Sequence, residues 1–160
     1  MGSERCIRDR ESIAKKVADI LEGVEIFDVA KVDKSKISEY KNLILATPTY
    51  GAGDMQGDWE EFLETLKPED FNDKIVALIG LGDQDTYADT FCDGLFPLYQ
   101  IVSKAATIIG ATKTDGYEYE SSSIVVNGEF VGLILDEDNQ EDLTEQRIKD
   151  WVKDIQDKFQ

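Results

Sequence analysis

Apolar positions along this chain follow two alternating patterns, one with the spacing of a helix and one typical of buried strands. Residues 11–23 predict an amphipathic helix that ends at Gly23, and residues 142–159 predict a longer one. Shorter helices are expected over 35–40 and 58–66. The apolar stripes of the first and last helices consist of Ile13, Val17, Ile20 and Leu21, and of Leu143, Ile148, Trp151, Val152, Ile155 and Phe159.

Nearly continuous apolar runs separate these helices. The longest runs are residues 42–50 and 74–83, and shorter ones occupy 24–29 and 106–112. Runs of this kind are typical of strands that a parallel sheet buries on both faces. We therefore expect four strands at these positions.

The second half of the chain contains two further signals. Residues 90–105 predict a helix, but Pro97 within it has no N–H to donate and should kink or shorten it. Asn127-Gly128 joins two strand-like runs within 123–135, which is a strong signal for a tight hairpin. The expected buried stripe of the helix is Phe91, Leu95, Leu98 and Val102.

Alternating strands and helices indicate an α/β fold with a mainly parallel sheet and helices on both faces. The 160 residues fit one domain, 1–160. In such sheets, ligands bind beyond the carboxyl ends of the strands. The loops of interest therefore follow residues 46 and 79.

The amino-acid composition excludes several classes of active site and of binding partner. The chain has no histidine, which excludes His-based triads and most zinc sites. Its net charge of −17 repels nucleic acid and anionic membranes and favours basic protein partners, or serves only solubility. No apolar run of the ~18 residues that a membrane helix needs is present. With no leader-like segment and two isolated cysteines, Cys6 and Cys92, a cytoplasmic location is expected.

Two glycine-rich loops, 46–59 and 80–91, follow the central strands, and each carries one tyrosine, Tyr50 or Tyr87. If the loops are neighbours, the two tyrosines could stack on a flat ring; otherwise the loops are ordinary surface turns. The carboxylates of the two loops could bind a divalent cation, although their spacing matches no EF-hand loop. They could also oppose the uptake of an electron by a bound cofactor. These carboxylates are Asp54, Asp58, Asp83, Asp85 and Asp89.

Residues 47–62 and 80–91 resemble the two flavin-ring loops of the flavodoxin family, long-chain type. Residues 130–151 resemble its C-terminal segment, and 114–136 match the hairpin inserted into the last strand of long-chain members. The resemblance implies a three-layer α/β/α fold and a noncovalent flavin mononucleotide (FMN). It also implies a monomer that carries single electrons between a reductase and acceptor enzymes through their basic faces.

The resemblance also implies which residues contact FMN. Tyr50 and Tyr87 would cover the two faces of the flavin ring, and Asp83 would lie near its pyrimidine side or ribityl chain. The backbone of four residues would bond the ring edges: Thr49, Gly51, Leu81 and Gly82. Three further residues of these loops are assigned to the cofactor site: Thr47, Pro48 and Phe91.

Residues 1–10 depart from the family pattern. Members begin with an apolar strand and a Ser/Thr/Gly/Asn loop around the FMN phosphate, whereas this segment reads MGSERCIRDR. A truncated or altered N-terminus is one interpretation. Without that loop the phosphate loses its N–H and hydroxyl donors, so we expect weak FMN binding or none.

Three functional readings follow. The preferred one is an electron carrier, which is not an enzyme because no substrate site is evident. The second is a scaffold that has lost FMN and acts as an acidic protein-interaction module. The third is a flavin-dependent reductase on the same scaffold.

Overall fold

The computed structural model describes residues 13, 15–21, 35–50, 54–55 and 57–159. The expected strand at 24–29, the atypical segment 1–10 and Gly51 lie outside the described residues.

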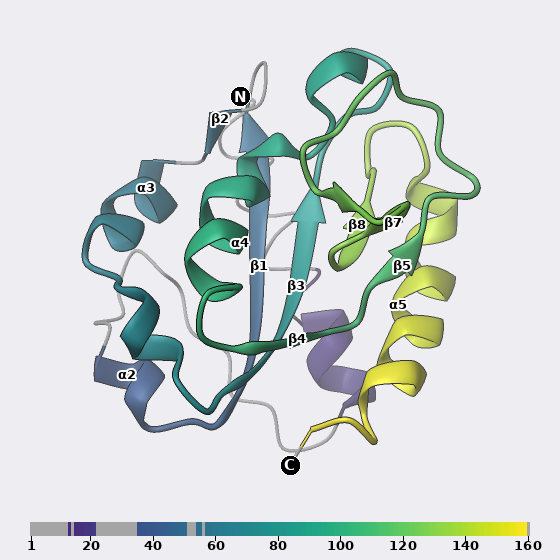
Figure 1. Ribbon diagram of the computed structural model, residues 1–160. Coiled ribbons are helices and arrows are strands. Elements are labelled where there is room, and N and C mark those ends of the chain that lie inside the picture. The colour runs from purple at the N-terminus through teal and green to yellow at the C-terminus, as the bar shows by residue number, and fades with distance from the viewer. Residues whose placement is uncertain (1–12, 14, 22–34, 51–53, 56, 160) are drawn as a thin grey trace.

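A parallel sheet forms the centre of the molecule. Strand β1 (Asn42–Tyr50) pairs with β3 (Ile75–Leu81) along its length, from Asn42 beside Ile75 to Pro48 beside Leu81. On its other side, β3 pairs with β4 (Thr107–Ile109) near its start and with β8 (Leu133–Leu135) near its end. The short strand β2 (Asp54–Met55) runs antiparallel to the end of β1. The expected parallel sheet is confirmed (Figure 1).

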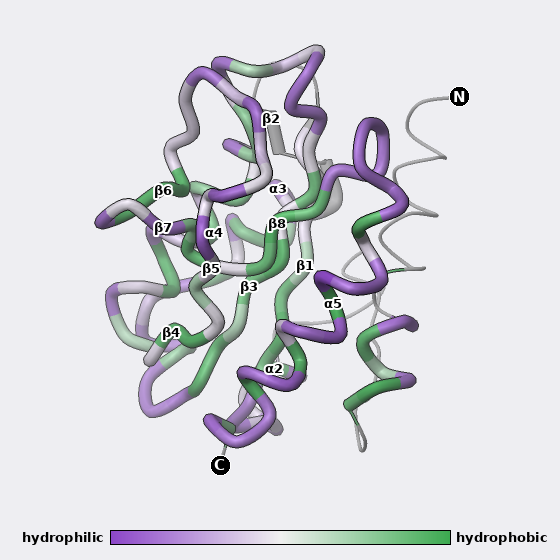
Figure 2. Tube along the Cα trace, turned by 90° about the vertical axis from the view of Figure 1, so that its right-hand side faces the viewer, coloured by the Kyte–Doolittle hydropathy of each residue, from purple (hydrophilic) through white to green (hydrophobic). Residues whose placement is uncertain are grey.

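Helices cover both faces of this sheet, as Figures 1 and 2 show from two sides. Helices α3 (Gly57–Glu64) and α4 (Phe96–Val102) lie on one face, with α2 (Ser35–Ser38) near the start of β1. Helix α5 (Glu141–Ile155) lies on the other, beside the helical residues 13 and 15–20.

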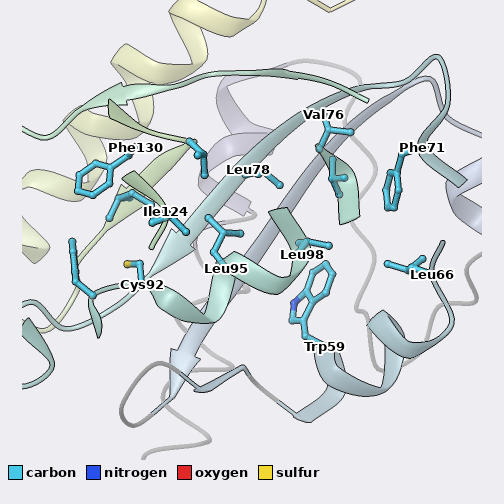
Figure 3. Packing of buried hydrophobic residues seen from close by; sticks show 14 of the residues in the cluster. Trp59, Leu66, Phe71, Val76, Leu78, Cys92, Leu95, Leu98, Ile124 and Phe130 are labelled. Carbon is cyan, nitrogen blue, oxygen red and sulfur yellow. The ribbon is translucent and has the colours of Figure 1, made fainter. Parts of the chain in front are cut away.

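Side chains of β3 alternate between two hydrophobic clusters, because successive strand residues point to opposite faces. Val76 and Leu78 pack with Trp59 and Leu98 under α3 and α4 (Figure 3). On the opposite face a second cluster packs under α5: Ile13, Val17, Ala77, Ile79, Leu81, Leu133, Leu135, Ile148, Trp151, Val152 and Ile155. All seven residues of β3 are buried, which is why the strand reads as a continuous apolar run.

The helix expected over 90–105 is wrong in its first part. Two short 3₁₀ turns, Ala88–Thr90 and Asp93–Leu95, come first, and α4 begins only at Phe96. Pro97 therefore lies in the first turn of the helix, where its missing N–H would have no intrahelical partner. The proline shortens the helix rather than kinking it.

Two residues of the expected apolar stripes are exposed. Leu143 is 40% exposed, whereas the next residue of the helix, Thr144, is fully buried. Ile20, in the last turn of the first helix, is 37% exposed. The remaining stripe residues of α5 up to Ile155 are buried, as expected.

Residues 110–132 interrupt the outermost strand of the sheet. The strand expected over 106–112 ends at Ile109, because Gly110 turns the chain with a φ of +86°. Strands β5 (Thr112–Lys113), β6 (Val125–Val126) and β7 (Glu129–Phe130) then form a small antiparallel sheet. Positive φ angles at Asn127 (55°) and Gly128 (82°) make the tight turn between β6 and β7, which confirms the hairpin.

The end of this insertion lies close to the main sheet. A Cβ atom on Gly132 would lie 2.1 Å from the carbonyl oxygen of Leu78, so only glycine fits where the chain passes β3.

Within the described ranges, no helix has both the length and the apolarity to cross a membrane.

Candidate cofactor site

The two glycine-rich loops begin side by side at one edge of the sheet. Thr47 pairs with Gly80 and Pro48 with Leu81, so β1 and β3 reach their carboxyl ends together. The side chains of Pro48 and Tyr50, like residues 51–53, lie outside the described part of the chain. The expected neighbourhood of the loops is thus present, whereas the placement of the Tyr50 ring stays a prediction.

The end of β1 is attached to the chain that follows the second loop. Thr47 is fully buried. The Oγ1 atom of Thr49 accepts a hydrogen bond of 3.1 Å from the backbone N–H of Gly94. This bond holds the 93–95 turn against the end of β1 and joins the two candidate loops.

Gly82 lies where the second loop leaves β3. Its N–H donates to the carbonyl of Leu135 over 3.1 Å, which extends the pairing of β3 with β8 by one residue. A Cβ atom on Gly82 would lie 2.7 Å from Sγ of Cys92 and 3.1 Å from its backbone nitrogen. The missing side chain therefore lets the loop fold back onto Cys92, while Leu81 remains buried below it.

Asp83 carries a fixed negative charge in this loop. Its Oδ1 accepts hydrogen bonds from the N–H groups of Asp85 (3.1 Å) and Thr86 (3.0 Å) and from Nδ2 of Asn139 (2.8 Å). Partial burial alone would raise the pKa of Asp83, but bonds from Thr86, Asn139 and Asp85 hold it below the ordinary value. The carboxylate is therefore ionised throughout the neutral range.

Tyr87 and Phe91 have different surroundings. Tyr87 is half-buried, its N–H donates to the carbonyl of Asp83 over 3.0 Å, and no ring pair found in the described part of the chain includes it. Phe91 is fully buried, with ring centroids 5.4 Å from Tyr119 and 6.1 Å from Phe130. The structure gives Phe91 a packing role, and its assignment to the cofactor stays a prediction.

Sequence reasoning missed a polar cluster beside the second loop, which consists of the buried Gln84 and Asp136 and the exposed Asn139. Asp136 is fully buried and accepts hydrogen bonds from both other residues. A signal was present, because Asp136 directly follows the last strand of the sheet, β8, at its carboxyl end.

A groove of about 530 Å³ opens next to this cluster. It is lined by Gln84, Asp85, Gly116, Tyr117, Glu118, Asn139 and Gln140. In the described ranges, no three Cys, Asp or Glu side chains converge as metal ligands would.

Known proteins resemble this chain over nearly its whole length. The family profile described as flavodoxin matches residues 10–151. A flavodoxin from Helicobacter pylori is 48% identical over 149 residues, which is 93% of this chain and 90% of that protein. A flavodoxin from a Nostoc species is 41% identical over 152 residues, covering 93% of this chain and 89% of that protein.

A solved structure agrees with these relatives. The crystal structure of Fusobacterium nucleatum flavodoxin bound to flavin mononucleotide superimposes with a TM-score of 0.87 and 42% identity. It covers 93% of this chain and 90% of that one. The parallel sheet, the two helical layers, the interrupted outer strand and these relatives lead to one conclusion: the chain belongs to the flavodoxin family.

Proposed function

We propose that this protein carries a noncovalent FMN and transfers single electrons between a reductase and acceptor enzymes. The observation that carries the proposal is the common end point of β1 and β3, where Pro48 lies beside Leu81. The loops with Tyr50 and Tyr87 both leave the sheet there. The Fusobacterium relative, which is bound to FMN, supports the same cofactor for this chain.

The residues at this edge suit a flat, uncharged ring. Tyr87 offers a half-buried aromatic ring with no ring partner among the described residues. In the proposed site, Tyr50 and Tyr87 cover the two faces of the flavin. Backbone groups of Thr49, Gly51, Leu81 and Gly82 bond its edges, next to Thr47 and Pro48. When bound, FMN supplies the one-electron chemistry, and the protein supplies position and charge.

The fixed negative charges of the protein lower the reduction potential of the bound flavin. A carboxylate about 10 Å from a group that becomes anionic opposes the added charge by about 1.7 kcal/mol at an effective dielectric constant of about 20. For one electron this equals a potential about 70 mV lower. Asp83, ionised in the neutral range, supplies one such charge. The proposed carrier is therefore a low-potential one.

The proposed partners follow from the net charge of −17. A reductase and acceptors with basic faces would be steered toward this surface, which speeds the encounter more than it tightens the complex.

The protein is proposed to act as a monomeric carrier and not as an enzyme. A cytoplasmic location fits the free, buried thiol of Cys92, since reducing compartments keep thiols unpaired.

Two titrations test the cofactor and its phosphate. Isothermal titration of the purified chain with FMN and then riboflavin, which lacks the phosphate, separates ring binding from phosphate binding. We expect both flavins to bind with similar, weak affinity, because residues 1–10 contain no recognisable phosphate loop. FMN binding in the nanomolar range, far tighter than riboflavin binding, would show that the phosphate is held after all.

Electron transfer is tested with the FMN-loaded chain, a flavin reductase supplied with a nicotinamide reductant, and a haem protein as acceptor. The carrier function predicts acceptor reduction only when all three proteins are present. A chain that remains colourless after incubation with excess FMN would support the interaction module instead. Steady reduction of a small-molecule acceptor without any partner protein would support a reductase enzyme.

A further inference from the structure

The carboxylate of Asp136 is enclosed at the carboxyl end of β8 and gathers five hydrogen bonds. Its Oδ2 accepts from the backbone N–H of Gln84 (3.0 Å), from Nε2 of Gln84 (2.8 Å) and from Nδ2 of Asn139 (2.8 Å). Its Oδ1 accepts from the N–H groups of Asp138 (3.1 Å) and Asn139 (3.0 Å).

Together with further bonds of Gln84 and Asn139, these bonds connect three segments that are distant in sequence. Gln84 belongs to the loop after β3, and Asn139 belongs to the loop after β8. Nδ2 of Asn139 also donates to Oδ1 of Asp83 over 2.8 Å, so the amide bridges two carboxylates. The Oε1 atom of Gln84 accepts from the N–H of Glu118, in the insertion 110–132.

All five donors are uncharged amide groups, so the stability of the buried charge depends on keeping every one of them in place. An asparagine at this position could not replace the carboxylate. One of its two terminal atoms would be an NH₂ group, which would face either the donors at Oδ2 or those at Oδ1. At least two donors would then lose their acceptor.

We infer that Asp136 is a positioning residue for the flavin. Its carboxylate fixes the position of the loop 82–87. Asp83 and Tyr87, which belong to this loop, are thereby held beside the flavin ring. The inference rests on the proposed function, because the loop is the segment proposed to bind the ring. The link through Gln84 to Glu118 makes the insertion a support for the same loop.

The first arm of the test needs no flavin. Amide hydrogen exchange of residues 82–87 is measured by NMR in the unliganded wild type, in Asp136→Asn and in Asp142→Asn. Asp142→Asn is the matched control, because Asp142 is exposed at the start of α5, shortly after Asp136 in the chain, and the variant loses one carboxylate in the same way. Exchange in this loop should be at least tenfold faster in Asp136→Asn and unchanged in the control.

The second arm measures flavin binding and the visible circular dichroism of the saturated complex. Asp136→Asn should weaken FMN and riboflavin by the same factor, at least tenfold, because the loop faces the ring and not the phosphate. The dichroism of the bound flavin should change, which a loss of overall stability alone would not cause. Asp142→Asn should match the wild type in both measurements.

A second variant covers the case in which Asp136→Asn does not fold. Gln84→Ala keeps the backbone bond to Asp136 and removes the side-chain links to Asp136 and Glu118. It should show the same changes to a smaller extent. Wild-type exchange, flavin affinity and dichroism in a folded Asp136→Asn or Gln84→Ala would overturn the inference. If the wild type binds neither flavin, the proposed function fails, while the exchange arm still decides whether Asp136 holds the loop.

Discussion

The side-chain oxygen of Thr49 accepts a hydrogen bond of 3.1 Å from the backbone N–H of Gly94. Thr49 is the next-to-last residue of β1 and lies just before the first loop. Gly94 is buried, so no water replaces this acceptor when it is removed. The bond directly connects the end of β1 with the chain that follows the second loop. We therefore expect its loss to affect both proposed flavin loops.

Thr49→Val tests this connection. Valine keeps the branched shape but removes the acceptor, and the buried N–H of Gly94 is left without a partner. We expect the free energy of unfolding to fall by about 1–2 kcal/mol. Urea unfolding followed by circular dichroism measures it. The control is Thr65→Val, whose exposed hydroxyl donates only to Phe62 within its own turn, and which should cost less than about 0.5 kcal/mol. Equal losses in the two variants would contradict the prediction.

Gly132 and Gly128 should respond differently to alanine. A Cβ atom on Gly132 would lie 2.1 Å from the carbonyl oxygen of Leu78, so the backbone of β3 or of the insertion must move. Gly132→Ala should destabilise the protein by roughly 3 kcal/mol or more. Gly128→Ala meets no atom within 4 Å and has only its φ of +82° to overcome, at a cost of about 1 kcal/mol. Thermal unfolding of both variants makes the comparison, and a milder effect at Gly132 would refute the close contact.

Trp151 connects α5 to the interrupted strand. Its Nε1–H donates to the carbonyl of Gly110 over 2.9 Å in the buried interior. Trp151→Phe leaves that carbonyl without its partner, so we expect a loss of about 2 kcal/mol in denaturant unfolding. Leu143→Ala, on the same helix but 40% exposed, should cost less than about 0.5 kcal/mol. If Trp151→Phe were as stable as the wild type, the hydrogen bond would make no net contribution.

Tyr117 should make stability fall in alkaline solution. Burial, together with Cys92 and Asp136, raises the pKa of Tyr117 from 10.0 to about 12, although the guanidinium of Arg147, 4.1 Å from the ring centroid, opposes the shift. Its neutral hydroxyl donates to the carbonyl of Ile134. Because the folded pKa is raised, this stabilisation is complete below pH 10 and is lost as the pH rises toward 12.

The measurement is the free energy of unfolding across that pH range. The wild type should lose on the order of 2 kcal/mol that Tyr117→Phe does not lose. Tyr99→Phe keeps the buried phenol of Tyr117 and should follow the wild-type curve. A Tyr117→Phe variant with the same alkaline loss as the wild type would assign that loss to other groups.

Local patterns predicted much of this fold. Strand β1 occupies the expected residues 42–50, because a nearly continuous apolar run is typical of a strand in a parallel sheet that is covered on both faces. The turn at Asn127-Gly128 is likewise local, since few residue pairs accept two positive φ angles in succession. The neighbouring positions of the two loops followed from the general rule that parallel strands end at one edge of the sheet.

Other features depended on contacts between distant segments. A helical period could not tell that residues 88–95 would contain two 3₁₀ turns, because Phe91 is buried against Tyr119 and Phe130 and Gly94 is bound to Thr49. Similarly, the exposed Leu143 was predicted to be buried because the pattern shows a period but not which side of the helix meets the sheet.

The sequence by itself determined the class of fold, the family and the two loops proposed to hold the flavin, since these depend on residue types at short spacing. Only the tertiary structure showed that Asp136 is buried and hydrogen-bonded to Gln84. A single acidic residue after a strand reads as an exposed loop residue until the chain brings Gln84, 52 positions away, within hydrogen-bond distance. Burial and hydrogen bonding across such separations depend on the packed arrangement of the whole sheet, which no local pattern encodes.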